Sequence, residues 1–167
     1  RREPDLTVRH GPAGWEVSLN RSALPDIRVD PAADGVAEAL SAARSVQRMV
    51  EARNSTLLEV GREIVRRQGE ALELGPIALR PMTMAELATA LGYHESTISR
   101  VVAGASLDGA RGRWWLRQMF IPALGGGGVP VISAAAMRAR LARAVAAEDP
   151  QTPLSDDALA TALLRET

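Results

Sequence analysis

Residues 83–103 read TMAELATALGYHESTISRVVA and constrain the fold more than any other stretch of the chain. Thr83 can accept a hydrogen bond from the first turn of a helix, while Glu86 can reach back to Thr83. Gly92 supplies the positive φ that ends a helix at a sharp turn. The pattern predicts two short helices joined by a turn at residues 92–94, with the first helix beginning at about Met84.

The apolar positions of this stretch form a seam between the two predicted helices. Ala88 leaves room for a close crossing, and Ile98 and Val101 close the seam from the second helix. The outward positions combine short polar groups with one arginine, as in a DNA recognition helix that contacts base edges and phosphates. The predicted DNA-binding residues on this helix are Glu95, Ser96, Thr97, Ser99 and Arg100.

The alternative for residues 83–103 is an ordinary helical hairpin with a solvated polar face. We favour the helix-turn-helix because the cap, the small residue, the glycine and the apolar positions all fall in register.

Positive charge begins where the second of these helices begins. The whole chain has 20 basic and 20 acidic residues, but residues 94–147 contain seven arginines and two acids. An excess of this kind is usually a solvated face, yet here it adjoins a DNA-reading motif and would supply phosphate contacts. The predicted DNA-binding residues therefore also include Arg111, Arg113 and Arg117.

The segment that carries these arginines is rich in aromatic residues. We expect residues 111–121 to form a helix that packs behind the recognition unit. The alternative, which we favour less, is that Trp114, Trp115 and Phe120 stack on bases.

The N-terminal part predicts a β-hairpin. Apolar and polar residues alternate over residues 6–19 on both sides of a turn at residues 10–14, which is the period of a half-buried strand pair. His10 is expected in that turn. Residues 22–31 contain two prolines and are expected to be extended.

Two helices are expected after the extended segment. Asp34 is the expected cap of the first helix, and an apolar stripe beginning at Val36 is expected to lie in the core. Residues 54–56 are interpreted as a helix breaker and as the cap of the second helix, which ends before Gly75. The exposed side of the first helix carries Arg44, Arg48 and Arg53.

The sequence of the last third of the chain predicts a linker and two short helices. Gly104 is the expected C-cap of the recognition helix, and residues 125–128 form a glycine linker. An amphipathic helix is expected from Ser133, and Ser155 is expected to cap a final helix. The expected fold class is mainly α, a helical bundle with a small N-terminal β-hairpin followed by a helix-turn-helix DNA-binding region.

The composition argues against several classes of function. The chain has no cysteine, no lysine and two distant histidines, so we find no nucleophile–base pair, thiolate metal site or Schiff-base residue. The glycine linker lacks the Gly-Lys-Ser/Thr sequence of a phosphate loop. We therefore expect no enzyme activity, no metal and no cofactor. We also expect no membrane span and no signal peptide, and hence a cytoplasmic protein.

Five sequence segments together resemble one known family. They are HESTISRV at residues 94–101, RPMTMAELA at 80–88, EARNSTLL at 51–58, GWEVSLN at 14–20 and PLSD at 153–156. In this order they resemble the bacterial sigma-54 family of transcription initiation factors. The first segment is quite specific to the family.

The resemblance implies a division of labour along the chain. Residues 1–78 would be the later part of an RNA polymerase core-binding region, with Arg44, Arg48 and Arg53 as contact residues. Residues 79–122 would face the downstream promoter element, residues 123–150 would form a linker and an amphipathic helix, and residues 151–167 would begin a terminal DNA-binding domain.

The resemblance further implies a monomer that binds core RNA polymerase and promoter DNA in a closed complex, which an ATP-hydrolysing activator opens. The family's activator-responsive N-terminal region and its terminal signature box ARRTVAKYRE are not seen in this sequence, so we expect a fragment of such a factor. The alternative is a free-standing helix-turn-helix repressor or activator that dimerises or senses a ligand.

Overall fold

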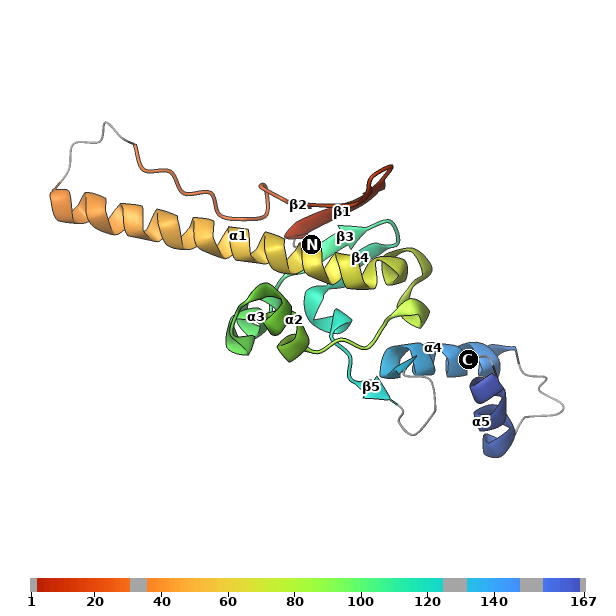
Figure 1. Cartoon of the computed structure of the whole chain (residues 1–167). Coiled ribbons are helices and arrows are strands. Elements are labelled where there is room, and N and C mark those ends of the chain that lie inside the picture. Colours follow the sequence, from red (N-terminus) through yellow and green to blue (C-terminus); the bar gives the residue numbers. More distant parts are fainter. Residues whose placement is uncertain (1–2, 31–35, 125–131, 148–154, 166–167) are drawn as a thin grey trace.

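The computed structural model describes residues 3–30, 36–124, 132–147 and 155–165. Its largest element is helix α1 (Ala37–Leu74), a single helix of 38 residues (Figure 1). The body of the protein lies against the C-terminal half of α1, while the N-terminal half projects past the other elements. One helix thus replaces the two that the sequence predicts, and the predicted break is wrong.

The side chains at the predicted break find hydrogen-bond partners without interrupting the helix. Thr56 Oγ1 donates to the carbonyl of Ala52 at 2.9 Å, one helical turn back. Asn54 Nδ2 donates to the carbonyl of Pro25 at 3.3 Å, in the segment that runs beside α1. Such residues cap a helix when they bond to free backbone N–H groups, but they are tolerated inside one when their side chains bond elsewhere.

The apolar stripe in the projecting half of α1 does not lie in the core, contrary to the prediction. Val36, before the helix, is 73% exposed, and Met49, within it, is 64% exposed. Leu57 is the first buried residue of α1, and the buried stripe continues from there to Leu72. The periodicity marks an apolar face, but the hydrophobic core covers it only from Leu57 onward.

The predicted β-hairpin is confirmed and belongs to a larger sheet. Strands β1 (Leu6–Gly11) and β2 (Gly14–Leu19) are antiparallel, and His10 lies in β1 opposite Trp15. Strands β3 (Ser106–Gly109) and β4 (Gly112–Trp115) complete the sheet in the order β2-β1-β3-β4. β3 runs parallel to β1, with Leu107 beside Leu6.

The aromatic segment after the helix-turn-helix is β4 and a 3-10 helix, η2 (Leu116–Met119), so the helix predicted over residues 111–121 is wrong. Gly112 has a φ of 106°, a left-handed value that a continuous α-helix does not contain. Strand alternation directs Trp114 toward the core and leaves Trp115 41% exposed. Because β1 binds β3 from the other end of the chain, local sequence does not reveal this pairing.

Two glycines of α1 allow the hairpin to lie directly on the helix. A Cβ atom on Gly61 would collide with a methyl group of Leu6, which is fully buried. A Cβ atom on Gly69 would lie 2.8 Å from Cε2 of Trp15 and closer still to its Nε1. The two glycines are about two helical turns apart on α1, so they open one face of the helix to the sheet.

One hydrophobic core joins both sides of the predicted boundary between residues 78 and 79. The helices of the helix-turn-helix are α2 (Met84–Leu91) and α3 (Glu95–Val102). The core combines residues of the hairpin, of α1 and of both these helices: Leu6, Val17, Ile64, Leu87 and Ile98. Cutting the chain at this boundary would therefore expose apolar surface on both pieces.

The remaining elements lie below this body. The 3-10 helix η1 (Pro76–Ala78) follows α1 and contacts α4 (Ala134–Ala146), and strands β5 (Ala123–Leu124) and β6 (Ile132–Ser133) pair before α4. α5 (Asp156–Arg165) begins with the predicted cap, because the amide of Ala158 donates to Ser155 Oγ at 3.3 Å.

The expected fold class, mainly α with a small β region, is confirmed. The predicted cap Asp34 and the glycine linker at residues 125–128 lie outside the described residues. Among the helices that are described, no apolar segment is long enough to cross a membrane.

Candidate nucleic-acid interface

The predicted capping box starts α2. The amide of Glu86 donates to Thr83 Oγ1 at 3.2 Å, and the amide of Thr83 donates to Glu86 Oε2 at 2.8 Å. This second bond lowers the pKa of the Glu86 carboxyl below its ordinary value, because it stabilises the charged form. The carboxylate also lies at the positive end of the helix dipole, so α2 begins at a fixed residue.

The turn between α2 and α3 is also as predicted, and it is anchored to α1. Gly92 adopts the left-handed conformation, with φ 71° and ψ 25°, and the amide of Tyr93 donates to the carbonyl of Ala88 at 2.9 Å. The hydroxyl of Tyr93 donates to Glu59 Oε2 on α1 at 2.8 Å, and this bond raises the pKa of Tyr93. The sequence analysis assigned Tyr93 to the turn but did not identify this anchor.

The cap of α3 was not predicted. His94 is the N-cap residue, and the amide of Ser96 donates to its Nδ1 at 3.3 Å. The ring nitrogen also lies 2.9 Å from Ser96 Oγ. The signal was present in the sequence, because His94 directly precedes the helix, but histidine is not among the preferred N-cap residues.

The seam of the helix-turn-helix differs from the prediction at one position. Ala88 and Ile98 are buried as expected, but Val102, which is 1% exposed, closes the seam, and Val101 is half-buried. The C-cap also differs, because Ala103 in the right-handed helical conformation, and not Gly104, ends α3.

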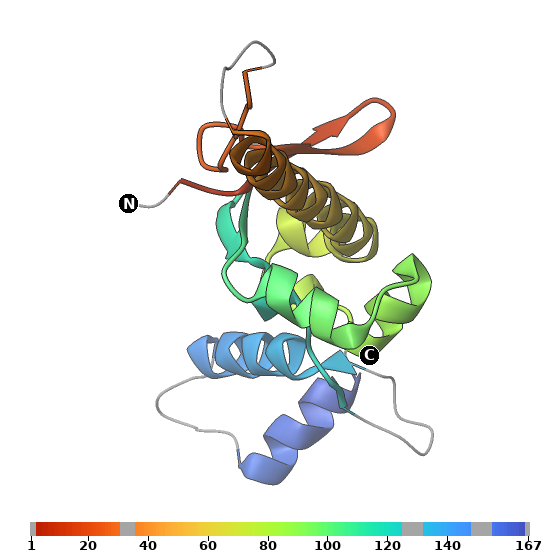
Figure 2. The same cartoon turned by 90° about the vertical axis from the view of Figure 1, so that its left-hand side faces the viewer.

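The outward side chains of α3 form the candidate interface. Glu95, Ser96 and Arg100 are exposed, and Thr97 and Ser99 are half-buried. Figure 2 shows α3 below α1. The surface therefore presents a short polar helix that the residues behind it hold in place.

Arg100 lies folded against its own helix. Its Nε donates to the carbonyl of Ser96 at 3.2 Å, and its Nη2 donates to Ser96 Oγ at 3.2 Å. These partners are neutral and exposed, so exchanging them for a guanine or a phosphate would desolvate no ion pair. The chain thus provides an arginine whose charge is available to a ligand.

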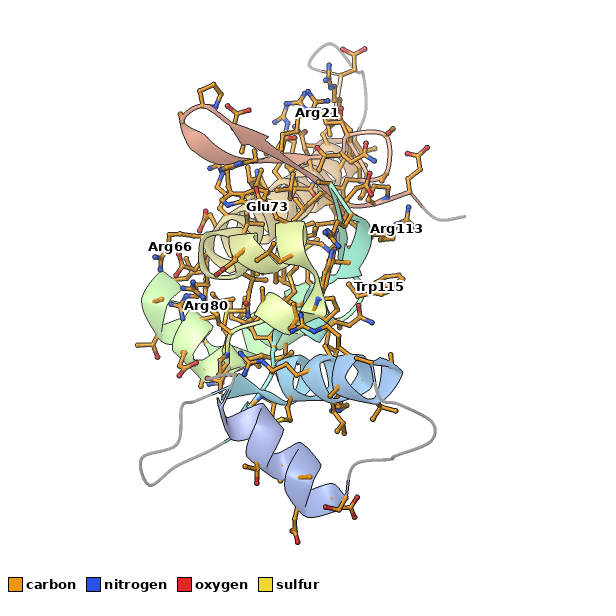
Figure 3. The ribbon with its side chains drawn as sticks, turned by 90° about the vertical axis from the view of Figure 1, so that its right-hand side faces the viewer. Arg21, Arg66, Glu73, Arg80, Arg113 and Trp115 are labelled. Atoms are coloured by element: carbon orange, nitrogen blue, oxygen red, sulfur yellow. The ribbon has the colours of Figure 1, made fainter. Side chains whose placement is uncertain are left out.

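The three arginines predicted from the charge excess lie elsewhere. Arg111 lies in the turn between β3 and β4, Arg113 on β4 and Arg117 in η2, and all three are exposed. Figure 3 shows Arg113 beside Trp115, away from α2, whereas α3 packs mainly against α2 and α1. The structure therefore does not group these arginines with the outward side chains of α3, and Arg113 and Arg117 do not occupy successive turns of one helix.

Other arginines near the helix-turn-helix already have acidic partners. Glu63 Oε1 lies 2.6 Å from Nη2 of Arg66 and 2.7 Å from Nε of Arg67 on α1. Hydrogen bonds from Arg66, the largest influence, and from Arg67 together lower the pKa of Glu63 to about 2. Arg80 pairs with Glu70 at 2.7 Å. Arg100 is therefore the arginine of this region best able to take a new anionic partner.

A comparison with known protein families identifies the family of this chain. A family model described as "Sigma-54, DNA binding domain" matches residues 33–167, which include α1 and the helix-turn-helix. The chain belongs to the sigma-54 family. The sequence resemblance is therefore confirmed.

Relatives in the sigma-54 family match over nearly the whole chain. The RNA polymerase sigma-54 factor of Cereibacter sphaeroides is 41% identical over 165 residues, which cover 93% of this chain and 38% of that protein. The sigma-54 factor of Escherichia coli (strain K12) is 35% identical over 176 residues, which cover 98% of this chain and 37% of that protein. The chain thus spans well under half the length of these sigma-54 relatives.

One solved structure has a similar fold. The crystal structure of Aquifex aeolicus sigmaN bound to promoter DNA matches with a TM-score of 0.61. The match covers 98% of this chain and 52% of the Aquifex chain, at 22% sequence identity. At this identity the likeness shows the fold alone.

Proposed function

We propose that this chain recognises promoter DNA through α3, as part of a sigma-54 factor that binds core RNA polymerase. The observation that carries the proposal is the exposed polar face of α3 on a helix-turn-helix fixed to α1. The arginine of this face, Arg100, donates its hydrogen bonds to a neutral serine of the same helix. A helix of this kind reads base edges from the major groove. The Aquifex protein of similar fold is described as bound to promoter DNA, which supports the proposal.

The proposal keeps the division of labour that the resemblance implies. Residues 1–78 would contribute to the contact with core RNA polymerase, residues 79–122 would face the downstream promoter element, and residues 151–167 would begin a terminal DNA-binding domain. The factor would act as a monomer, and an ATP-hydrolysing activator would open the closed complex. The membership of the chain in the sigma-54 family argues against the alternative of a free-standing repressor or activator.

The proposed polymerase contact uses the projecting half of α1. Arg44, Arg48 and Arg53 are exposed there, beside an apolar face that the described residues leave largely uncovered. Exposed arginines beside apolar surface are typical of protein interfaces. Replacing all three arginines by alanine in the whole chain should weaken binding to core RNA polymerase in a native gel. Unchanged binding would remove these residues from the proposal.

The substitution Arg100→Ala tests whether α3 recognises bases. The guanidinium of Arg100 could span the two acceptors of a guanine in the major groove. Its removal should therefore cost about 1–3 kcal/mol of binding free energy on a matched promoter, or about five- to 150-fold in Kd. The loss on a scrambled downstream element should be much smaller. Arg138→Ala on α4 is the matched control, because it removes an exposed arginine outside α3.

Two results of this test would contradict the proposal. Equal losses on matched and scrambled DNA would assign Arg100 to backbone contacts. No loss on either DNA would remove α3 from the interface.

A further inference from the structure

Gln68 of α1 is a polar side chain in the centre of the core. It is 1% exposed, and its amide reaches two other segments of the chain. Its Nε2 donates to the carbonyl of Arg80 at 2.7 Å and to the carbonyl of Met119 at 3.0 Å. Its Oε1 accepts a hydrogen bond from the amide of Arg80 at 2.9 Å. Both donor hydrogens are thus used, and the buried amide is satisfied.

The two segments that Gln68 holds lead into and away from the helix-turn-helix. Arg80 lies just before the cap of α2, and Met119 ends η2. Beyond Gln68 these segments pair with each other, because the amides of Met82 and Ile121 each donate to the other's carbonyl at 3.0 Å. Gln68 therefore ties α1 to a short backbone ladder from which α2 begins.

This tie has a directional character that an apolar contact would lack. Packed apolar side chains resist displacement by their shape, whereas hydrogen bonds to an N–H and two carbonyls add a dependence on direction as well as distance. An apolar side chain of the same size would offer none of these bonds and would leave the buried carbonyl of Met119 without this donor. The exposed bond between Tyr93 and Glu59 holds the other end of the helix-turn-helix, so the two ties together resist rotation.

We propose that Gln68 is a positioning residue that fixes the angle between α1 and the helix-turn-helix. This inference rests on the proposed function, in which the projecting half of α1 contacts polymerase and α3 contacts DNA. With the angle fixed, polymerase bound to α1 presents α3 to DNA in one orientation, so that binding of one partner favours binding of the other.

Spin labels can measure the angle directly, because the chain contains no cysteine. Ser41→Cys on the projecting half of α1 and Ala90→Cys on α2 place two labels at exposed positions that are not among the proposed contact residues. Pulsed electron resonance then gives the distribution of distances between the labels. We expect a narrow distribution in the otherwise unchanged chain and a broad or shifted one with Gln68→Met, which keeps the volume but loses all three hydrogen bonds.

Two further variants separate positioning from general loss of stability. Gln47→Met makes the same change on the projecting half of α1, where the amide bonds only to Glu51 of the same helix, and should leave the distribution narrow. Gln68→Leu also loses all three hydrogen bonds but places no charge at this buried position, and should broaden the distribution even if Gln68→Met does not fold. A narrow, unchanged distribution in folded Gln68 variants would overturn the inference.

The functional measurement is the affinity for promoter DNA with and without core RNA polymerase. Polymerase should raise the DNA affinity of the unchanged chain, and Gln68→Met should reduce that gain by about five-fold or more, the lower end of typical coupling. The affinity for each partner alone should change little. Full coupling in Gln68→Met would overturn the inference and leave the proposed function standing. If the unchanged chain bound neither partner, the proposed function would fail, whereas the spin-label result would still decide whether Gln68 fixes the angle.

Discussion

The contact between Trp15 and Gly69 gives the sharpest test of how the hairpin is held on α1. A Cβ atom on Gly69 would lie 2.8 Å from Cε2 and 2.9 Å from Cδ1 of the indole ring. The ring is rigid and itself contacts the ring of His10, with centroids 4.6 Å apart and an interplanar angle of 33°. Gly69→Ala should therefore force the indole, and the hairpin with it, away from the helix.

Two opposing effects set the size of the change. Alanine is better than glycine inside a helix by about 1 kcal/mol. Forcing an extra carbon into a filled contact costs about 1–3 kcal/mol. The second effect should win, so Gly69→Ala should lower the free energy of unfolding by about 1 kcal/mol.

The sign should reverse when the indole is removed. In a Trp15→Ala background the new methyl group meets no ring, so Gly69→Ala should raise the free energy of unfolding by up to about 1 kcal/mol. The coupling between the two changes then equals the overpacking cost, about 1–3 kcal/mol. Urea unfolding followed by circular dichroism measures all four proteins.

Gly104→Ala is the control for this cycle, because a Cβ atom there meets nothing within 4 Å and its φ is not positive. It should change stability by less than about 0.5 kcal/mol. The indole does not pack on α1 as described if Gly69→Ala stabilises the chain with Trp15 present. The same conclusion follows if the effects of the two substitutions on the free energy of unfolding are additive.

Three further predictions concern the helix-turn-helix and its surroundings. Thr83→Ala should cost about 0.5–2 kcal/mol in urea unfolding, while Thr89→Ala on the exposed face of α2 should cost less. Glu63 has a pKa of about 2 against an ordinary 4.5, so its stabilisation is present above pH 4.5 and is lost as the pH falls toward 2. In Glu63→Gln the free energy of unfolding should therefore fall by about 1 kcal/mol less over this pH range. This is less than the pKa shift alone would give, because solvent screens the exposed Arg66. An unchanged pH dependence would count against the pairing. If Arg113 touches a phosphate, Arg113→Ala should weaken matched and scrambled DNA equally and reduce the log–log salt slope by about 0.9, whereas an unchanged slope would place this arginine outside the DNA interface.

The sequence by itself determined the units whose signals are local. Thr83, Glu86 and Gly92 define the start and end of α2 within ten residues, and the structure shows the capping box and the left-handed turn that they predict. The alternation in the N-terminal hairpin is equally local, because each strand pairs with its neighbour across a two-residue turn. The outward residues of α3 follow from the helical periodicity of residues 95–102, which is also a local signal. The α3 part of the candidate interface was therefore visible in the sequence.

The tertiary structure decided where those units stand and what the ambiguous segments become. Asn54 and Thr56 carry a cap signature, but partners from Pro25 and the preceding turn let α1 continue through them. The segment with Trp114 has the composition of a helix or a strand, and the parallel pairing of β3 with β1 makes it a strand.

The contacts of Gln68 show most clearly that the sequence does not reveal which distant segments meet. In the sequence this residue is one more polar position on a helix, yet the fold buries it and joins it to Arg80 and Met119. Sequence periodicity reports which face of an element is apolar, but it carries no information about which distant backbone groups will lie opposite that face. That choice is made only when the whole core assembles, because the hydrogen bonds and the close glycine contacts exist only between segments far apart in the chain.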